Sequence, residues 1–170
     1  MPRKKTPDSE DRTPLTRLRE GSAHGLVGYQ MAQATLVTNQ VFDERVGHAR
    51  GGLRRVEFTI LALVQGNRDV TARQLARALA VTPPNIAIWL DKLESRGLIE
   101  RERSTSDARM QHVRLTARGT ALVDRSVQVL LEGERVALDG LSVAERAMLV
   151  ELLHKVALSR RKPEKAPPRD

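Results

Sequence analysis

The sequence predicts a mainly α protein with a small β-hairpin wing: a winged helix-turn-helix lobe joined to a helical dimerisation region. Two observations predict this fold. Between residues 70 and 119, two short helical patterns joined by a tight turn precede an apolar-alternating hairpin that carries several arginines. Longer helical patterns flank this segment on both sides. The order helix, turn, helix, hairpin makes sequence-specific binding to double-stranded DNA the leading function.

The composition favours a polyanionic partner. The chain has 170 residues, a formal net charge of +8 and a sequence pI of about 10.7. A strongly basic small protein usually meets a polyanion, although a basic surface also serves solubility. The absence of cysteine excludes disulfides and thiolate metal sites. No apolar run approaches the roughly 18 residues that span a membrane. The N-terminus lacks the apolar segment of a secretory signal, so we expect a cytoplasmic protein with no membrane partner.

The first flanking pattern, residues 22–49, predicts a long helix with apolar residues on several sides. Such a helix needs several packing partners, a second subunit among them. Gly51 and Gly52 end it, and a buried helix follows from about Arg54 to Gln65.

The helix-turn-helix pattern begins with a capping box at Thr71–Gln74, which opens a helix ending near Ala80. Thr82 then caps a second helix, with Pro83 at its first position, where a missing N–H costs nothing. The inward face of this helix has the spacing i, i+3, i+4, i+7 and consists of Ile86, Trp89, Leu90 and Leu93. Its outward face carries Pro84, Asn85, Ala87, Ile88, Asp91, Lys92 and Ser95. Asn85 is the best candidate for hydrogen bonds to base edges.

Residues 98–103 and 111–115 alternate and predict a hairpin. Its polar loop carries Arg109, which suits the negative potential of a narrow minor groove. Asp107 is placed to hold the Arg109 guanidinium by a charge-assisted hydrogen bond. An ordinary solvated loop pair is the alternative interpretation.

Two further helices are expected at residues 116–139 and 142–158. Thr116 caps the first, and Ser142–Glu145 forms a capping box for the second. One apolar face of the second is expected to consist of Met148, Leu149, Leu152 and Val156.

The run from Ala76 to Gly119 resembles the MarR family of bacterial transcription regulators. The matching segments are Leu75-Ala76, Leu79, Val81-Thr82-Pro83, residues 90–94, residues 96–99, Asp107-Ala-Arg109 and Val113-Arg-Leu115-Thr116-x-x-Gly119. The Asp-x-Arg loop followed by Leu-Thr-x-x-Gly is the most specific mark. The flanking helices also fit, so the resemblance covers about residues 22–158. Ala80 departs from the pattern, since the family often has Gly or Asn in this turn.

The resemblance implies an obligate homodimer joined by its N- and C-terminal helices, with one winged lobe in each subunit. Members mostly repress, often by binding palindromes near their own promoters. Many release DNA when a small aromatic or phenolic acid binds between the dimer region and the lobes.

The expected domain organisation has five parts: a disordered tail at 1–14, an N-terminal dimerisation helix at 15–53, the winged helix-turn-helix DNA-binding lobe at 54–119, C-terminal dimerisation helices at 120–158 and a disordered basic tail at 159–170. The predicted DNA-binding residues are Thr82, Pro84, Asn85, Ile88, Lys92, Arg103, Asp107 and Arg109. The candidate effector-binding residues are Tyr29, Phe42, His48 and Phe58, for each of which core packing is the alternative.

Two other function classes are alternatives to a ligand-released repressor. An architectural DNA-binding protein without an effector would share the winged lobe but show weak site preference. A winged helix that dimerises an enzyme needs a catalytic domain, for which no residues remain. We expect no enzyme, since no nucleophile–base pair, metal motif or cofactor loop is visible. The histidines His24, His48, His112 and His154 lack ligand spacing, so neither metal nor cofactor is expected.

Overall fold

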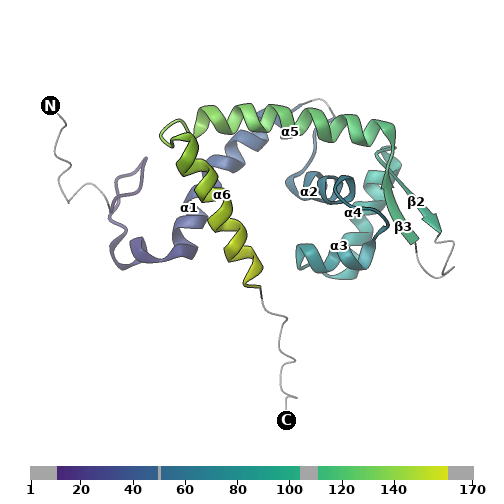
Figure 1. Ribbon diagram of the computed structural model, residues 1–170, viewed down its shortest axis with the longest axis horizontal. Helices are drawn as coiled ribbons and strands as arrows, with labels where there is room; N and C mark the ends of the chain where they lie inside the picture. Colours follow the sequence, from purple (N-terminus) through teal and green to yellow (C-terminus); the bar gives the residue numbers. More distant parts are fainter. Residues whose placement is uncertain (1–10, 50, 104–110, 161–170) are drawn as a thin grey trace, which may run out of the picture. The chain divides into compact units, whose positions relative to one another are not determined.

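The computed structural model describes residues 11–49, 51–103 and 111–160 (Figure 1). The chain forms two compact units, one ending at Glu134 and the other beginning at Arg135. The first unit contains a 3₁₀ turn (Gly21–Gly25), α1 (Val27–Phe42), a π-helical turn (Asp43–Gly47), α2 (Arg55–Gln65), β1 (Val70–Thr71), α3 (Ala72–Leu79), α4 (Pro83–Ser95), β2 (Ile99–Arg103), β3 (Gln111–Leu115) and most of α5 (Ala117–Ala137). The second unit contains the end of α5 and all of α6 (Val143–Leu158).

The fold class is the predicted one, mainly helical with a small antiparallel sheet. The long helix expected over residues 22–49 is instead three segments, since a 3₁₀ turn precedes α1 and a π-helical turn follows it. Leu26 is extended between the 3₁₀ turn and α1. Gly21, Gly25 and Gly28 lower the helix propensity of this stretch, which accounts for the break. None of the described helices is both long and apolar enough to cross a membrane.

The sheet has three strands in the order β1-β3-β2, not the two of the predicted hairpin. β2 and β3 form the predicted hairpin, and their register places Ile99 opposite Leu115 and Arg103 opposite Gln111. β1 adds Val70 opposite Val113 on the other edge of β3. A two-residue strand is too short to show a period of two, so sequence patterning could not reveal it.

The turn between α3 and α4 confirms one predicted cap and corrects another. The Gln74 amide donates to Thr71 Oγ1 at 3.3 Å, as the capping box requires. Ala80 closes α3 in the left-handed conformation, with φ of 53°, which explains why the family often has Gly or Asn at this turn. The Thr82 side chain, however, accepts no capping hydrogen bond. Pro84 occupies the second position of α4 and removes one of the two amides, those of the second and third positions, from which a capping side chain accepts.

One face of α4 is buried in the core of the first unit. Ile86, Leu90 and Leu93 are almost completely inaccessible, and Trp89 packs against them while partly buried, as predicted. Gly97 ends the helix with φ of 65°, and the Leu98 amide donates to the Leu93 carbonyl at 3.0 Å. This Gly-dependent ending turns the chain into β2. The opposite face of α4 is thereby directed to solvent.

The Leu-Thr-x-x-Gly segment joins the hairpin to α5. Thr116 Oγ1 accepts from the Gly119 amide at 3.0 Å and donates to the Gly97 carbonyl at 2.8 Å. Gly119 itself lies against the Leu98 backbone, where an added Cβ would be 2.0 Å from the carbonyl oxygen. The segment therefore fixes the start of α5 onto the turn that ends α4.

The second unit begins its helix with the predicted capping box. The Ser142 amide donates to Glu145 Oε2 at 2.8 Å, and the Glu145 amide donates to Ser142 Oγ at 3.3 Å. The single apolar face expected for α6 is too narrow a description, because large apolar side chains are exposed around much of the helix: Val143, Met148, Leu149, Val150, Leu152, Leu153, Val156 and Leu158.

Gly119→Ala is expected to destabilise the protein by about 1–3 kcal/mol, the usual cost of forcing an atom into a packed site. The obstacle is a backbone carbonyl, which has no rotamer by which to move away. Gly66→Ala is the matched control, because its Cβ would meet only the Ala62 carbonyl at 3.6 Å. Urea unfolding should show the control within about 0.5 kcal/mol of wild type. Equal stabilities for the two variants would contradict this packing.

Candidate nucleic-acid interface

The solvent-facing side of α4 carries four of the predicted DNA-binding residues. Thr82, Pro84, Asn85 and Ile88 are all exposed, and Ile88 is 61% exposed although it is a large apolar side chain. They occupy the first half of the helix. An exposed helix face with an amide and an apolar group in its first turns suits base edges, since an amide can bind adenine and an apolar group can contact a thymine methyl.

Lys92 lies at the other end of α4 and is engaged within the protein. Its Nζ is 2.7 Å from Glu57 Oε1, while about half of its side chain is exposed. Glu57 belongs to α2 and is 1% exposed. The structure therefore separates Lys92 from the first-turn residues with which the sequence grouped it.

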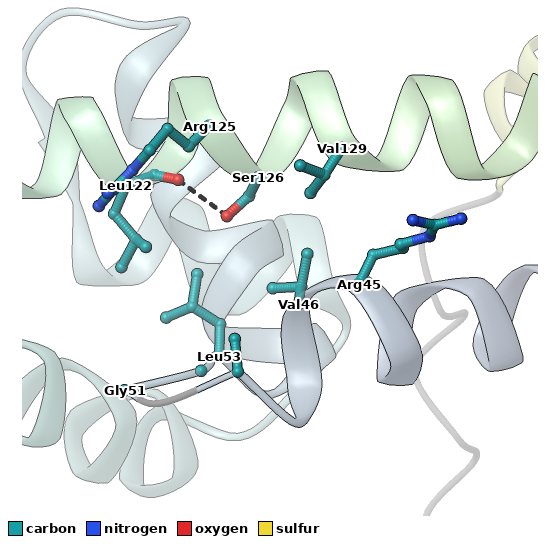
Figure 2. A pocket seen from close by; sticks show the side chains of 10 residues that line it. Arg45, Val46, Gly51, Leu53, Leu122, Arg125, Ser126 and Val129 are labelled. Carbon is teal, nitrogen blue, oxygen red and sulfur yellow. Dashed lines mark hydrogen bonds between the residues drawn. The ribbon is translucent and has the colours of Figure 1, made fainter.

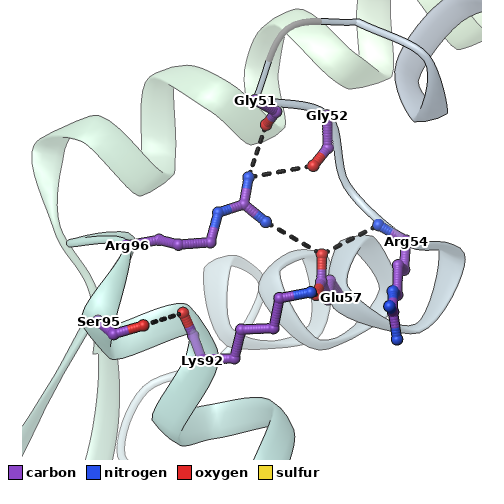
Figure 3. Close-up of polar contacts among 7 residues, drawn as sticks. All are labelled: Gly51, Gly52, Arg54, Glu57, Lys92, Ser95 and Arg96. Atoms are coloured by element: carbon purple, nitrogen blue, oxygen red, sulfur yellow. Dashed lines mark hydrogen bonds and ion pairs between the residues drawn. The ribbon is translucent and has the colours of Figure 1, made fainter.

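Glu57 is also bound by Arg96, the residue that follows α4 (Figure 3). Glu57 Oε2 accepts from Arg96 Nη1 at 3.1 Å and from the Arg54 amide at 3.0 Å. Arg96 Nη2 donates to the carbonyls of Gly51 and Gly52, at 2.6 and 3.1 Å. These contacts join α2, the end of α4 and the loop before α2.

The pKa of Glu57 reflects opposing influences. Burial raises the pKa, because it disfavours the charged carboxylate. The Lys92 hydrogen bond, the backbone amide at residue 54 and the two nearby positive charges outweigh burial. They hold the pKa below its ordinary 4.5.

Arg101 forms ion pairs with two acids on α4. Its Nη2 is 2.5 Å from Asp91 Oδ1, and its Nε is 3.5 Å from Glu94 Oε2. These ion pairs attach β2 to α4 and offset negative charge on the helix that would face a polyanion. Sequence reasoning missed this contact. Opposite charges ten and seven residues apart are the only signal, and they do not indicate which acid pairs with which base.

Other arginines of the first unit are exposed. Arg103, a predicted DNA-binding residue, is exposed at the end of β2. Arg73 and Arg77 are exposed on α3, and Arg118 is exposed at the start of α5. The other two predicted contacts, Asp107 and Arg109, lie outside the described residues.

The four candidate effector residues do not line one pocket. Phe42 and Phe58 pack together, with ring centroids 5.7 Å apart, and Phe42 is part of the core. His48 is exposed. Tyr29 lies thirteen residues before Phe42, roughly 20 Å away along α1. Desolvation, followed by the negative charge of Glu20, raises the pKa of Tyr29.

The first unit contains a cavity of about 210 Å³ between the turn after α1 and the middle of α5 (Figure 2). Its wall is largely apolar, and Figure 2 shows the side chains of Arg45 and Arg125 on either side of it. The lining residues are Arg45, Val46, Ala49, Gly51, Gly52, Leu53, Leu122, Arg125, Ser126 and Val129. Sequence reasoning did not select this set, because it joins the turn after α1 to the middle of α5. Among the residues that the structure describes, no three acidic or histidine side chains gather to hold a metal ion.

The fold and the exposed α4 face define a winged helix-turn-helix DNA-binding protein. The MarR family model matches residues 53–110. The transcriptional repressor CouR, solved bound to a 23-mer DNA duplex, is 30% identical over 82% of this chain and 98% of its own, with a TM-score of 0.73. A protein described as a probable transcriptional regulator from Pseudomonas aeruginosa is 26% identical over 79% of this chain and 98% of its own, with a TM-score of 0.67.

The fold is also shared with BpsR of Bordetella bronchiseptica, whose DNA binding is regulated by 6-hydroxynicotinic acid. BpsR is 23% identical over 80% of this chain and 96% of its own, with a TM-score of 0.68. Together these findings show that the chain belongs to the MarR family. It is a DNA-binding transcription regulator.

The charged form of Glu57 is expected to stabilise the fold in a defined pH range. Since its pKa is lower in the folded chain than the ordinary 4.5, its stabilisation is fully present above about pH 5. It should be lost as the pH falls below 4.5 and through the folded pKa. Urea unfolding between pH 3 and pH 7 should therefore show that the free energy of unfolding of wild type exceeds that of Glu57→Gln near pH 7, and that this difference shrinks towards pH 3. A difference that grows on acidification would contradict a lowered pKa of Glu57.

Proposed function

We propose that the protein is a homodimeric repressor that binds a palindromic operator and is released by a small organic acid. The observation that carries the DNA-binding part is the exposed first half of α4, held on a core by its buried face. The proposed contacts are Thr82, Pro84, Asn85, Ile88 and Arg103, with Asp107 and Arg109 of the wing. Lys92 leaves this set, because its ammonium group is engaged by Glu57.

The dimer proposal is supported by apolar surface that the described chain leaves uncovered. In α6 the exposed side chains include Leu152 and Val156, and in α1 they include Val27 and Leu36. Burying such surface yields roughly 25 cal/mol per Å², so helices of this kind favour association. We therefore assign dimerisation to residues 15–53 and 120–158, on either side of the DNA-binding lobe at 54–119.

The effector proposal is supported by the cavity beside Arg45 and Arg125. Its apolar side chains, among them Val46 and Leu53, suit the body of a small aromatic molecule, and a guanidinium suits its carboxylate. BpsR offers a precedent, since 6-hydroxynicotinic acid regulates its binding to DNA. An effector acts only through its differential affinity for the DNA-binding and released forms. An architectural protein without an effector remains the second candidate.

DNA recognition is tested by selecting duplexes from a random pool with the wild-type protein. We expect a pseudo-palindrome with half-sites roughly 10 base pairs apart, because a twofold dimer presents two copies of α4. On this selected duplex, Asn85→Ala should raise Kd by about 5–150-fold, the range for a lost base contact. Ser95→Ala, at the far end of the same helix, is the control and should bind like wild type. Failure to enrich any sequence would favour the architectural protein.

Light scattering at micromolar concentration should give a mass near twice 18.9 kDa. Leu152→Glu places a charge on the exposed apolar surface of α6 and should shift the population toward monomer. Glu151→Gln is the neighbouring control, because that carboxylate is exposed and pairs only with Lys155 among the described side chains. A wild-type species of 18.9 kDa alone would refute the dimer.

The effector is tested with a panel of salicylate, 4-hydroxybenzoate and 6-hydroxynicotinate. At least one should weaken binding to the selected duplex, and Arg125→Gln should reduce that response by removing a cationic group from the cavity. Arg55→Gln is the control, since Arg55 pairs with Asp43 and does not line the cavity. A panel without effect on DNA affinity would instead support the effector-independent protein.

A further inference from the structure

Glu57 is the one charged side chain that is fully buried in the described core. Burying a carboxylate is costly unless it is paired and hydrogen-bonded. Replacing a buried ion pair with apolar side chains is often neutral or stabilising, so stability alone does not explain such a group. A buried charge with several directional partners fixes the positions of the helices and loops that carry those partners.

The two cationic partners of Glu57 lie at one end of α4. Lys92 is in its last turn, and Arg96 follows it directly. Both reach the same carboxylate, at 2.7 and 3.1 Å. The residues proposed to read DNA lie in the first half of the helix, so the anchored end and the reading end are different.

Arg96 extends the contact to the cavity. Its Nη2 binds the carbonyls of Gly51 and Gly52, and both of these residues line the cavity (Figures 2 and 3). The loop is closely packed, because a Cβ at Gly52 would lie 2.4 Å from the Gly47 carbonyl oxygen. A displacement of this wall therefore reaches Arg96 through two direct hydrogen bonds.

We propose that Glu57 and Arg96 are positioning residues that fix the tilt of α4 and transmit movement of the cavity wall to it. The inference rests on the proposed role of α4 in reading DNA. A helix of 13 residues is roughly 18 Å long from first to last Cα. A tilt of about 10° at the anchored end would move the reading end by roughly 3 Å. That displacement is enough to break hydrogen bonds to bases, which require about 2.7–3.2 Å.

The test compares wild type, Glu57→Gln and Glu44→Gln on the selected duplex. Both variants remove one negative charge, which by simple electrostatics tightens binding to DNA. Glu44 is the control, because it is exposed and its side chain bonds Gln40. Glu57→Gln should raise Kd by about tenfold, within the range known for residues that couple sites. The salt dependence of Kd should keep its slope, because no phosphate contact is removed.

Trp89 provides a readout that needs no DNA. It is the only tryptophan of the chain and lies on α4. Acrylamide quenching of its fluorescence should change in Glu57→Gln and remain as in wild type in Glu44→Gln. If Glu57 only stabilised the fold, Glu57→Gln would lower the free energy of unfolding but leave Trp89 quenching in the folded protein unchanged.

Arg96→Lys keeps the inference testable if Glu57→Gln does not fold. It keeps the positive charge beside Glu57 but loses the fork that binds the carbonyls of residues 51 and 52 together with the carboxylate. It should also weaken DNA binding and alter Trp89 quenching. Folded variants with unchanged Kd and unchanged quenching would overturn the inference. If wild type selects no duplex, the proposed DNA reading fails, while quenching still decides the positioning role.

Discussion

The pairing of one buried carboxylate with two cations is the constraint on which the lobe depends. Glu57 has almost no access to water, so Lys92 and Arg96 must remain close to it. This requirement fixes the end of α4 against α2. The Arg96 guanidinium also donates to the carbonyls of Gly51 and Gly52, so the loop before α2 is held to the end of α4 as well. The exposed first half of α4 therefore extends from a helix end whose position is fixed.

A second set of contacts holds the chain where it leaves α4. Gly97 turns the chain into β2, and Thr116 binds the Gly97 carbonyl while capping α5. Gly119 permits α5 to begin directly against Leu98. From the other side, Arg101 attaches β2 to Asp91. Hairpin, α4 and α5 are thus joined within a few residues, which makes the lobe a rigid support for DNA contacts.

Local features were predictable from the sequence, whereas long-range pairings were not. The capping box at Thr71 and the buried face of α4 depend on neighbours within a few residues. β1 was missed because its partner strand lies about forty residues away and only two residues pair. Lys92 is exposed, as its spacing predicts, but spacing does not reveal its ion-pair partner Glu57, 35 residues earlier. The cavity was missed for the same reason, because its lining comes from separate segments.

The most direct measurement is a crystal structure of the protein with its selected duplex. If Glu57 fixes the helix while its first half reads DNA, Lys92 Nζ and Arg96 should still lie about 3 Å from the Glu57 carboxylate, with Asn85 at base edges in the major groove. A complex in which Lys92 has left Glu57 for a phosphate, with α4 in the same position, would show that this ion pair does not hold the helix. That result would contradict the account.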